Sequence, residues 1–175
     1  MATPTSSGCV VLDIDGVVAD VRHRLHHLDV QPKNWDAFFA AAKNDRLLAI
    51  GADLANTAAL THTIVYFTGR PERLRAATTK WLESNGLPRG RLLMRRDGDR
   101  RPAVQTKLQQ LRGLRAEIRV DLVVDDDPIV IDAVAAAGFE ARLADWMPRA
   151  QRTSATSNSR HGDVLREAQE RDGRT

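Results

Sequence analysis

An apolar run that ends in two closely spaced aspartates and a glycine, VVLDIDG at residues 10–16, constrains the fold of this chain more than any other stretch. Its first three residues are β-branched or aliphatic, as in a buried strand. Side chains of an extended segment alternate, so Asp13 and Asp15 leave the same side of the backbone, and Gly16 then permits a sharp turn. Two carboxylates in a buried place repel each other unless a cation or a proton lies between them. We therefore expect a paired-carboxylate site at the end of this strand.

Two other interpretations compete with this one. A solvated turn after a strand commonly contains aspartate and glycine. A calcium loop requires glycine at about its sixth position and glutamate at about its twelfth. Counted from Asp13, these positions hold Val18 and Arg24, which excludes the calcium loop. The turn interpretation has to be weighed against the rest of the chain.

Length and composition favour one soluble globular domain. At 175 residues the chain suffices for one well-filled core but not for two large domains. No stretch approaches the length of a membrane span, and residues 1–10 lack the blocks of a secretory signal. We expect a cytoplasmic location and no membrane partner. Cys9 is the only cysteine, which excludes an intramolecular disulfide and a cysteine-based zinc site. The net charge of +3 permits anionic partners without requiring them.

The order of apolar and helix-breaking residues predicts strands that alternate with helices. Besides the first, strands are expected at residues 63–67, 92–94, 119–124 and 139–143. Helices are expected from the caps Asp20, Asn34 and Asp127, after Pro71, and over residues 49–60 and 104–114. This alternation predicts an α/β fold, in which helices cover both faces of a mainly parallel sheet.

Ligands of such sheets bind outside the carboxyl ends of the strands, where further polar groups are expected. Thr68 and Gly69 lie between a strand and a helix N-terminus, whose free amides favour a phosphate. Asp125 and Asp126 follow another strand. Lys107 lies on the apolar stripe of a helix, where its ammonium either meets an anion or extends outward to water. Together with the first aspartates, these groups fit around a divalent cation and a phosphoryl group, which outweighs the solvated-turn interpretation.

Other clusters carry less weight. His23 and His27 have the spacing of a helical metal pair, but no nearby glutamate completes a zinc-protease pattern, so surface or capping contacts are favoured. The arginine-dense loop RRDGDRRP, at residues 95–102, is typical of a solvated face. The aromatic residues within 35–39 are typical of core or cover packing.

The chain resembles the haloacid dehalogenase (HAD) superfamily of phosphotransferases over roughly residues 9–145. Its four motifs correspond, in order, to Asp13-Ile14-Asp15-Gly16-Val17, Thr68-Gly69-Arg70, Lys107 and Asp125-Asp126. Within the superfamily, residues 68–72, 98–101 and Lys107 are most similar to the 3′-phosphatase domain of polynucleotide kinase-phosphatases. Two residues depart from the pattern: Val17 replaces the commonest threonine, and Ala103 replaces an aspartate typical of that group. The sequence contains no GxxxxGK[ST] loop, so no kinase partner is expected within it.

The resemblance implies a HAD-like, Rossmannoid three-layer sandwich over residues 1–149, with a small helical cover at about residues 20–60. An open site beneath so short a cover suits a large substrate such as a nucleic-acid end. Residues 150–175 are rich in polar residues and are expected to form a disordered tail, with a short helix at 163–171.

The resemblance also implies a magnesium-dependent phosphatase that removes 3′-phosphate from nucleic-acid ends during repair. Asp13 would attack phosphorus to form an aspartyl-phosphate, and Asp15 would serve as general acid and then as general base. The magnesium ion would be held by Asp13, Asp126 and the main-chain carbonyl of Asp15, with Asp125 in support. The phosphoryl group would be bound by Thr68, Gly69 and Lys107, and the rest of the substrate by Arg70 and Arg101.

Three alternatives remain. The stretch DIDGVVAD is also close to the first motif of 5′(3′)-deoxyribonucleotidases, which would make a nucleotide the substrate of a small-molecule phosphatase. In a signalling receiver domain the lysine follows the last acidic strand end, whereas Lys107 precedes it. A catalytically inactive binding module is disfavoured by the intact Asp13 and Asp15. The oligomeric state is left open by the sequence.

Overall fold

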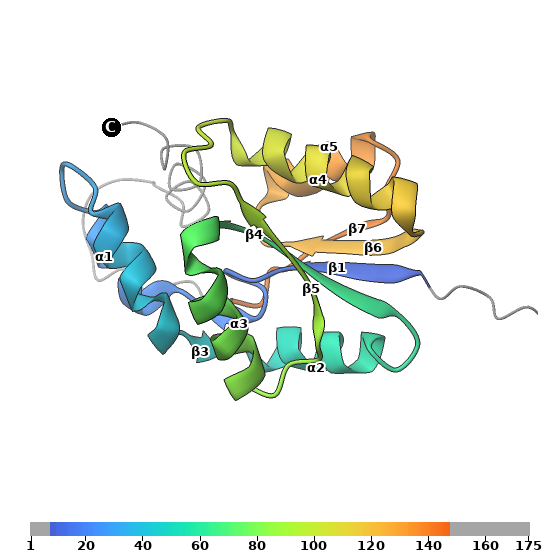
Figure 1. Ribbon diagram of the computed structural model, residues 1–175, viewed down its shortest axis with the longest axis horizontal. Helices are drawn as coiled ribbons and strands as arrows, with labels where there is room; N and C mark the ends of the chain where they lie inside the picture. Colours follow the sequence, from blue (N-terminus) through green and yellow to red (C-terminus); the bar gives the residue numbers. More distant parts are fainter. Residues whose placement is uncertain (1–7, 148–175) are drawn as a thin grey trace, which may run out of the picture.

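The computed structural model describes residues 8–147, which are organised around one sheet of five parallel strands (Figure 1). The strand order is β5-β4-β1-β6-β7, and every pairing is parallel. From edge to edge, the strands are β5 (Gly90–Arg95), β4 (Thr63–Pro71), β1 (Cys9–Asp13), β6 (Val120–Asp125) and β7 (Ala141–Leu143). This topology confirms the predicted α/β class and brings the carboxyl ends of the strands to one edge.

Four helices cover the two faces of the sheet (Figure 1). One face carries α2 (Ala49–Ala58) and α3 (Arg75–Ser84), and the other carries α4 (Ala103–Glu117) and α5 (Pro128–Ala136). Asp127 caps α5 as predicted, because its side chain accepts a hydrogen bond from the Ile129 amide at 2.9 Å.

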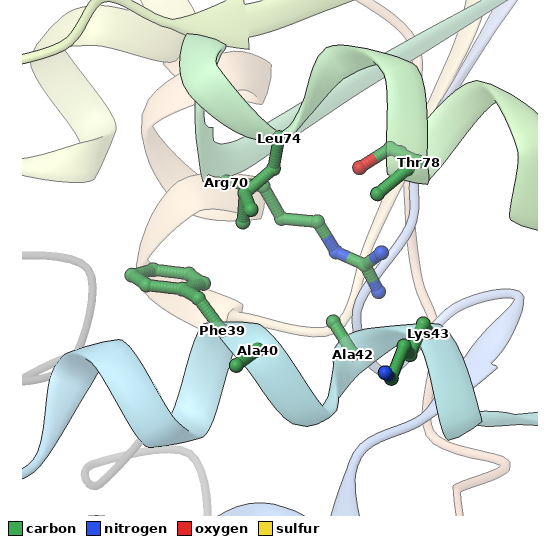
Figure 2. Close-up of a pocket in the computed structure, with 8 residues that line it drawn as sticks. Phe39, Ala40, Ala42, Lys43, Arg70, Leu74 and Thr78 are labelled. Carbon is green, nitrogen blue, oxygen red and sulfur yellow. The ribbon is translucent and has the colours of Figure 1, made fainter.

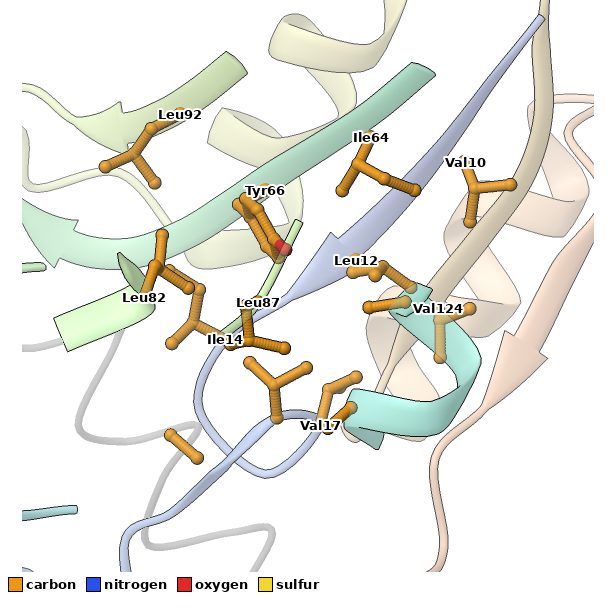
Figure 3. Packing of buried hydrophobic residues seen from close by; sticks show 14 of the residues in the cluster. Val10, Leu12, Ile14, Val17, Ile64, Tyr66, Leu82, Leu87, Leu92 and Val124 are labelled. Atoms are coloured by element: carbon orange, nitrogen blue, oxygen red, sulfur yellow. The ribbon is translucent and has the colours of Figure 1, made fainter. Parts of the chain in front are cut away.

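Alternate residues of β1 pack into two separate cores, one on each face of the sheet. Val10 and Leu12 pack in the cluster beneath α2 and α3, together with Ile64 of β4 (Figure 3). Val11 points the other way and packs beneath α4 and α5 with Phe67. Because both faces of β1 are buried, the strand is apolar without interruption until it reaches Asp13.

A segment of short elements follows β1, and we call residues 22–44 the cover. It consists of η1 (Arg22–Leu28), α1 (Trp35–Ala40) and η2 (Ala41–Asn44). The strands β2 (Ala19–Asp20) and β3 (Arg46–Leu47) pair in antiparallel fashion on either side of it. Its aromatic residues pack within its own small core, with Phe38 and Phe39 buried there. The cover is shorter than the expected residues 20–60, because α2 packs on the sheet.

The first helical prediction was wrong in type. An α-helix capped by Asp20 was expected, but η1 is a 3₁₀ helix whose N-cap, Val21, makes no side-chain capping bond. The Asp20 carboxylate instead accepts hydrogen bonds from the backbone amide of Arg22 at 3.0 Å and from its guanidinium. This local ion pair satisfies the carboxylate that would otherwise have capped a helix.

The second strand also departs from its predicted end. It was expected to stop at Phe67, with a helix starting near Pro71, but β4 continues to Pro71 and is followed by the 3₁₀ helix η3 (Glu72–Leu74). The helix α3 therefore begins at Arg75, and Thr68 and Gly69 do not lie at its N-terminus. The helix-dipole argument for a phosphate at these two residues does not hold.

No helix within residues 8–147 is long and apolar enough to cross a membrane. The expected tail at residues 150–175, with its short helix at 163–171, lies outside the described residues.

Candidate active site

A buried lysine joins the ends of two neighbouring strands. The Lys107 ammonium of α4 donates hydrogen bonds to Asp13 Oδ2 at 2.8 Å and to Asp125 Oδ2 at 2.6 Å. Its side chain is 2% exposed, and Nζ lies 4.7 Å from the centroid of the Phe67 ring. The sequence left open whether this lysine meets an anion or extends to water, and the structure places it against two carboxylates.

Neighbouring charges and burial decide the protonation of Lys107 and Asp13. Burial alone would lower the pKa of Lys107, but Asp125 and Asp13 outweigh it and raise the pKa above its ordinary value, so the ammonium stays charged. Burial raises the pKa of Asp13 to about 7, although Lys107 opposes this shift. Asp13 therefore holds a proton more firmly than an ordinary carboxyl group in the absence of a further cation.

Asp13, Asp125 and Asp126 form an acidic cluster in which one carboxylate oxygen from each lies within 4.8 Å of the others. Burial raises the pKa of Asp126 well above its ordinary value, and Asp125 and Asp13 add to the shift. The turn after β1 lies directly against the Asp126 carboxylate, since a Cβ on Gly16 (φ 80°) would lie 2.1 Å from Asp126 Oδ2. Carboxylate oxygens at this spacing, with charges that Lys107 offsets in part, fit a hard divalent cation such as Mg²⁺.

Asp15 lies in a second, arginine-rich network beside this cluster. Its Oδ1 accepts hydrogen bonds from Arg24 Nη2 at 2.8 Å and from Arg70 Nε at 3.0 Å. Both guanidinium groups also bind Asp45, with Arg24 Nε 2.8 Å from Oδ1 and Arg70 Nη2 2.7 Å from Oδ2. All four side chains are buried, so two carboxylates and two arginines balance in charge away from water.

This network favours the charged form of Asp15. Burial alone would raise its pKa, but Arg24 and Arg70 outweigh burial and hold the pKa at about 2. Asp45 is held in turn, because Trp81 Nε1 donates to its main-chain carbonyl at 3.0 Å. His23 connects Asp45 to the surface, with Nε2 2.8 Å from Asp45 Oδ1. His23 therefore forms a hydrogen bond with the carboxylate that Arg24 and Arg70 also bind.

Arg24 and Asp45 were not identified from the sequence. Arg24 lies among apolar residues of the cover, and its partner Asp45 is 21 residues further along the chain. No local pattern predicts this pairing. The nearest signal is the composition of η1, in which an arginine takes an inward position beside Leu25 and Leu28.

Arg70, expected to contact substrate, is 1% exposed and is committed to Asp15 and Asp45. A cavity of about 60 Å³ lies between the cover and α3, and the Arg70 guanidinium extends into it between Thr78 and Ala42 (Figure 2). These contacts hold the Asp15 carboxylate in place. Arg101 lies on the loop after β5, where it pairs with Asp99 and donates to Gln109.

Thr68 and Gly69 lie next to the acidic cluster by strand register. Phe67 of β4 is paired with Asp13, so Thr68 follows directly beyond the carboxyl end of β1. Thr68 is 2% exposed, and its Oγ1 accepts a hydrogen bond from the Arg70 amide at 3.2 Å. The structure therefore brings both residues to the edge of the sheet that holds Asp13, by strand extension and not by a helix N-terminus.

A family model for the phosphatase domain of the polynucleotide kinase PNKP matches residues 7–142. The chain belongs to this family. The PNKP-type phosphatase domains are HAD-type hydrolases, and the resemblance inferred from the four motifs is confirmed. No curated protein sequence matches the chain significantly.

Solved structures show the same fold. A chain of the Pnkp1/Rnl/Hen1 RNA repair complex is similar, with a TM-score of 0.66 and 22% identity, over 82% of this chain and 44% of that chain. A Pnkp1/Rnl/Hen1 complex in a second structure gives a TM-score of 0.67 and 20% identity, over 81% and 47% of the two chains. The HAD-hydrolase YfnB from Bacillus subtilis, bound to magnesium, has a TM-score of 0.56 and 10% identity, over 78% and 88%. The chain thus spans less than half the length of the two repair-complex chains.

Proposed function

We propose that this PNKP-type domain is a magnesium-dependent phosphomonoesterase that removes 3′-phosphate from nucleic-acid ends. The observation that carries the proposal is the buried Lys107, which donates hydrogen bonds to Asp13 and Asp125, two members of the acidic cluster at the carboxyl edge of the sheet. A cation site and a fixed ammonium side by side suit a phosphoryl group, whose charge both would offset.

Asp13 is the nucleophile in this proposal. Its Oδ1 accepts a hydrogen bond from the Ile14 amide at 2.8 Å, which fixes the orientation of the carboxylate. A carboxylate oxygen attacks phosphorus in line, the ester P–O bond breaks, and the phosphoryl group is transferred to Asp13. Water then cleaves the aspartyl-phosphate and releases inorganic phosphate.

Asp15 moves the protons in both steps. Arg24 and Arg70 hold its Oδ1, so Oδ2 is the oxygen that gives a proton to the departing 3′-oxygen. The negative charge of a bound phosphate opposes the arginines and raises the pKa of Asp15, which allows it to carry that proton. Once deprotonated, it takes a proton from the attacking water in the second step.

Asp13, Asp126 and the main-chain carbonyl of Asp15 would hold Mg²⁺, with Asp125 in support. The ion would supply charge neutralisation for the anionic groups that meet there. Lys107, Thr68 and the Gly69 amide are the groups proposed to bind the phosphoryl oxygens.

The stabilisation by magnesium should depend on pH. A carboxyl group whose folded-state pKa is raised stabilises the protein fully below its unfolded pKa, and this contribution is lost as pH rises through the folded pKa. For Asp13 the ordinary pKa is 3.8 and the folded value is about 7, so the metal-free protein should lose stability between about pH 4 and 7. Because the cation replaces the proton, the rise in Tm on adding Mg²⁺ should increase by several degrees over the same range. Thermal unfolding with EDTA or with Mg²⁺ measures this, and a magnesium effect that shrinks with rising pH would contradict the assignment.

The nucleic-acid end is favoured as substrate by the short cover and by the match to a PNKP family model. The alternative, a deoxyribonucleotidase, is favoured by the stretch DIDGVVAD. We expect kcat/KM for a 3′-phosphorylated oligonucleotide to exceed that for a deoxynucleoside monophosphate by at least about tenfold, because distant parts of a long substrate contribute binding energy. Phosphate release with Mg²⁺ on both substrates measures the ratio, and the reverse preference would establish the nucleotidase.

A further inference from the structure

An arginine-lined groove runs along the outer edge of the sheet, between β5, the loop that follows it and α4. We call it the β5 groove. Its volume is about 290 Å³. The charged side chains that line it are Arg91, Arg95, Arg96, Arg101, Asp99 and Glu117. Four cations thus face two carboxylates, and the groove is positively charged.

Both carboxylates of the groove already have arginine partners. Glu117 pairs with Arg91 at 2.5 Å, and Asp99 pairs with Arg101 at 2.6 Å. The Asp99–Arg101 pair holds the pKa of Asp99 at about 2, so this carboxylate stays charged and occupied. Counted over the lining side chains, positive charges therefore exceed negative charges by two, and the exposed Arg96 carries one of them.

The shape of the groove is fixed by one of its own arginines. The Arg95 side chain is buried, and its Nη1 donates to the main-chain carbonyls of Asp99 at 3.1 Å and Arg101 at 3.0 Å. Arg96 follows directly and is exposed, and among residues 8–147 no carboxylate forms an ion pair with it. The groove thus combines a loop whose main chain is held by Arg95 with the accessible guanidinium of Arg96.

The position of the groove relates it to the phosphatase site. Arg95 lies at the carboxyl end of β5, the edge of the sheet at which Asp13 and Asp125 lie, and Arg91 lies near the opposite end of the strand (Figure 1). At about 3.3 Å per residue, the four residue steps from Arg91 to Arg95 span roughly 13 Å, which exceeds the length of a single phosphate group. Along this length the groove presents the paired arginines Arg91 and Arg101 and the exposed Arg96, so it suits an extended polyanion better than a single phosphate.

We propose that the β5 groove binds the phosphodiester backbone of the nucleic-acid strand whose 3′-phosphate enters the catalytic site. The inference rests on the proposed function and extends it, since it assigns the 5′-ward continuation of the substrate to a surface outside the catalytic residues. Arginine contacts to phosphates of this kind position a strand without reading its sequence.

Gly113 of α4 provides a test that changes charge alone. It lines the groove, and a Cβ at this position would meet no atom within 4 Å, so a longer side chain has room. Gly113→Glu places a carboxylate in the groove, and Gly113→Gln is the matched neutral control. We expect Gly113→Glu to raise the Kd of a fluorescent single strand bearing a 3′-hydroxyl at least about fivefold relative to Gly113→Gln. Fluorescence anisotropy between about 50 and 200 mM salt measures it.

A second variant removes a proposed phosphate contact. Arg96→Ala should reduce the slope of log Kd against log salt concentration by about one, as expected when one phosphate contact is lost. Equal Kd values for Gly113→Glu and Gly113→Gln, or an unchanged salt slope in Arg96→Ala, would overturn the proposal. So would binding of poly-glutamate as tight as that of the strand, because the groove would then recognise an acidic protein.

The proposal for the β5 groove and the proposed phosphatase activity are tested independently of each other. Binding of the 3′-hydroxyl strand involves no catalysis, so its dependence on groove charge is measured even if the wild-type protein releases no phosphate from a 3′-phosphorylated strand. That result would refute the proposed phosphatase activity but would support nucleic-acid binding by the groove. Hydrolysis of the 3′-phosphorylated strand, with equal strand binding by Gly113→Glu and Gly113→Gln, would support the phosphatase activity and refute binding by the groove.

Discussion

Asp13→Asn should lower kcat for phosphate release from a 3′-phosphorylated oligonucleotide by at least about 10⁴-fold. An amide oxygen does not form the acyl-phosphate bond, and the change also removes one carboxylate from the acidic cluster. Asparagine keeps the shape of the side chain and still accepts the hydrogen bond that the Ile14 amide gives to Asp13. The effect should therefore fall on the chemical step and not on folding.

Folding and activity are measured together in this experiment. Because burial raises the pKa of Asp13, its charge is costly in the folded protein, and Asp13→Asn should unfold at a Tm no lower than that of the wild type. Asp121→Asn is the matched control, since Asp121 pairs with Arg119 on the protein surface and lies at the opposite end of β6. A kcat of Asp13→Asn within about tenfold of that of Asp121→Asn would show that Asp13 is not the nucleophile.

Asp45→Asn should destabilise the fold and impair catalysis at once. The substitution leaves Arg24 and Arg70 buried with Asp15 as their only carboxylate among residues 8–147, and breaking a buried ion pair costs about 3–5 kcal/mol. The free energy of unfolding, measured with urea, should fall by about that amount. Since both arginines would shift, Asp15 would lose its orientation, and kcat should fall by about 10²-fold under conditions in which the variant is folded.

A surface ion pair provides the comparison for Asp45. Glu72 pairs with Arg75 three residues on, and both side chains are more than 40% exposed. Glu72→Gln should change the free energy of unfolding by less than about 1 kcal/mol, because water screens the pair. A loss in Asp45→Asn no larger than that in Glu72→Gln would show that the buried network does not support Asp15.

Local patterns were sufficient to predict the α/β sheet and to select Asp13, Asp15, Lys107 and Asp125. The alternation of strands and helices places strand ends at one edge, and these residues lie at strand ends or on an adjoining helix. Asp13 is the last residue of β1, but it lies in the acidic cluster, whereas Asp15, two residues on, lies in the arginine network. The outcome for Lys107 depended on its partners, which the helical pattern alone did not decide.

The network of Arg24, Arg70, Asp15 and Asp45 could not be predicted from local sequence patterns. Arg24 and Arg70 reach Asp15 and Asp45 from positions up to 55 residues away, and such pairings depend on how the cover folds over the sheet. The extension of β4 through Thr68 and Gly69 was missed for a similar reason. Pro71 favours the first turn of a helix, but pairing of Pro71 with Arg95 of β5 keeps this part of the chain extended.

If Asp13 is the nucleophile, its carboxylate carries a phosphoryl group during turnover. Acid quenching of the wild-type protein during turnover of a 3′-phosphorylated oligonucleotide with Mg²⁺, followed by peptide mass spectrometry, tests it most directly. We expect one added phosphoryl group on the peptide that contains Asp13, and none on that peptide in Asp13→Asn. Phosphorylation of a different residue, with Asp13 unmodified during rapid turnover, would contradict it.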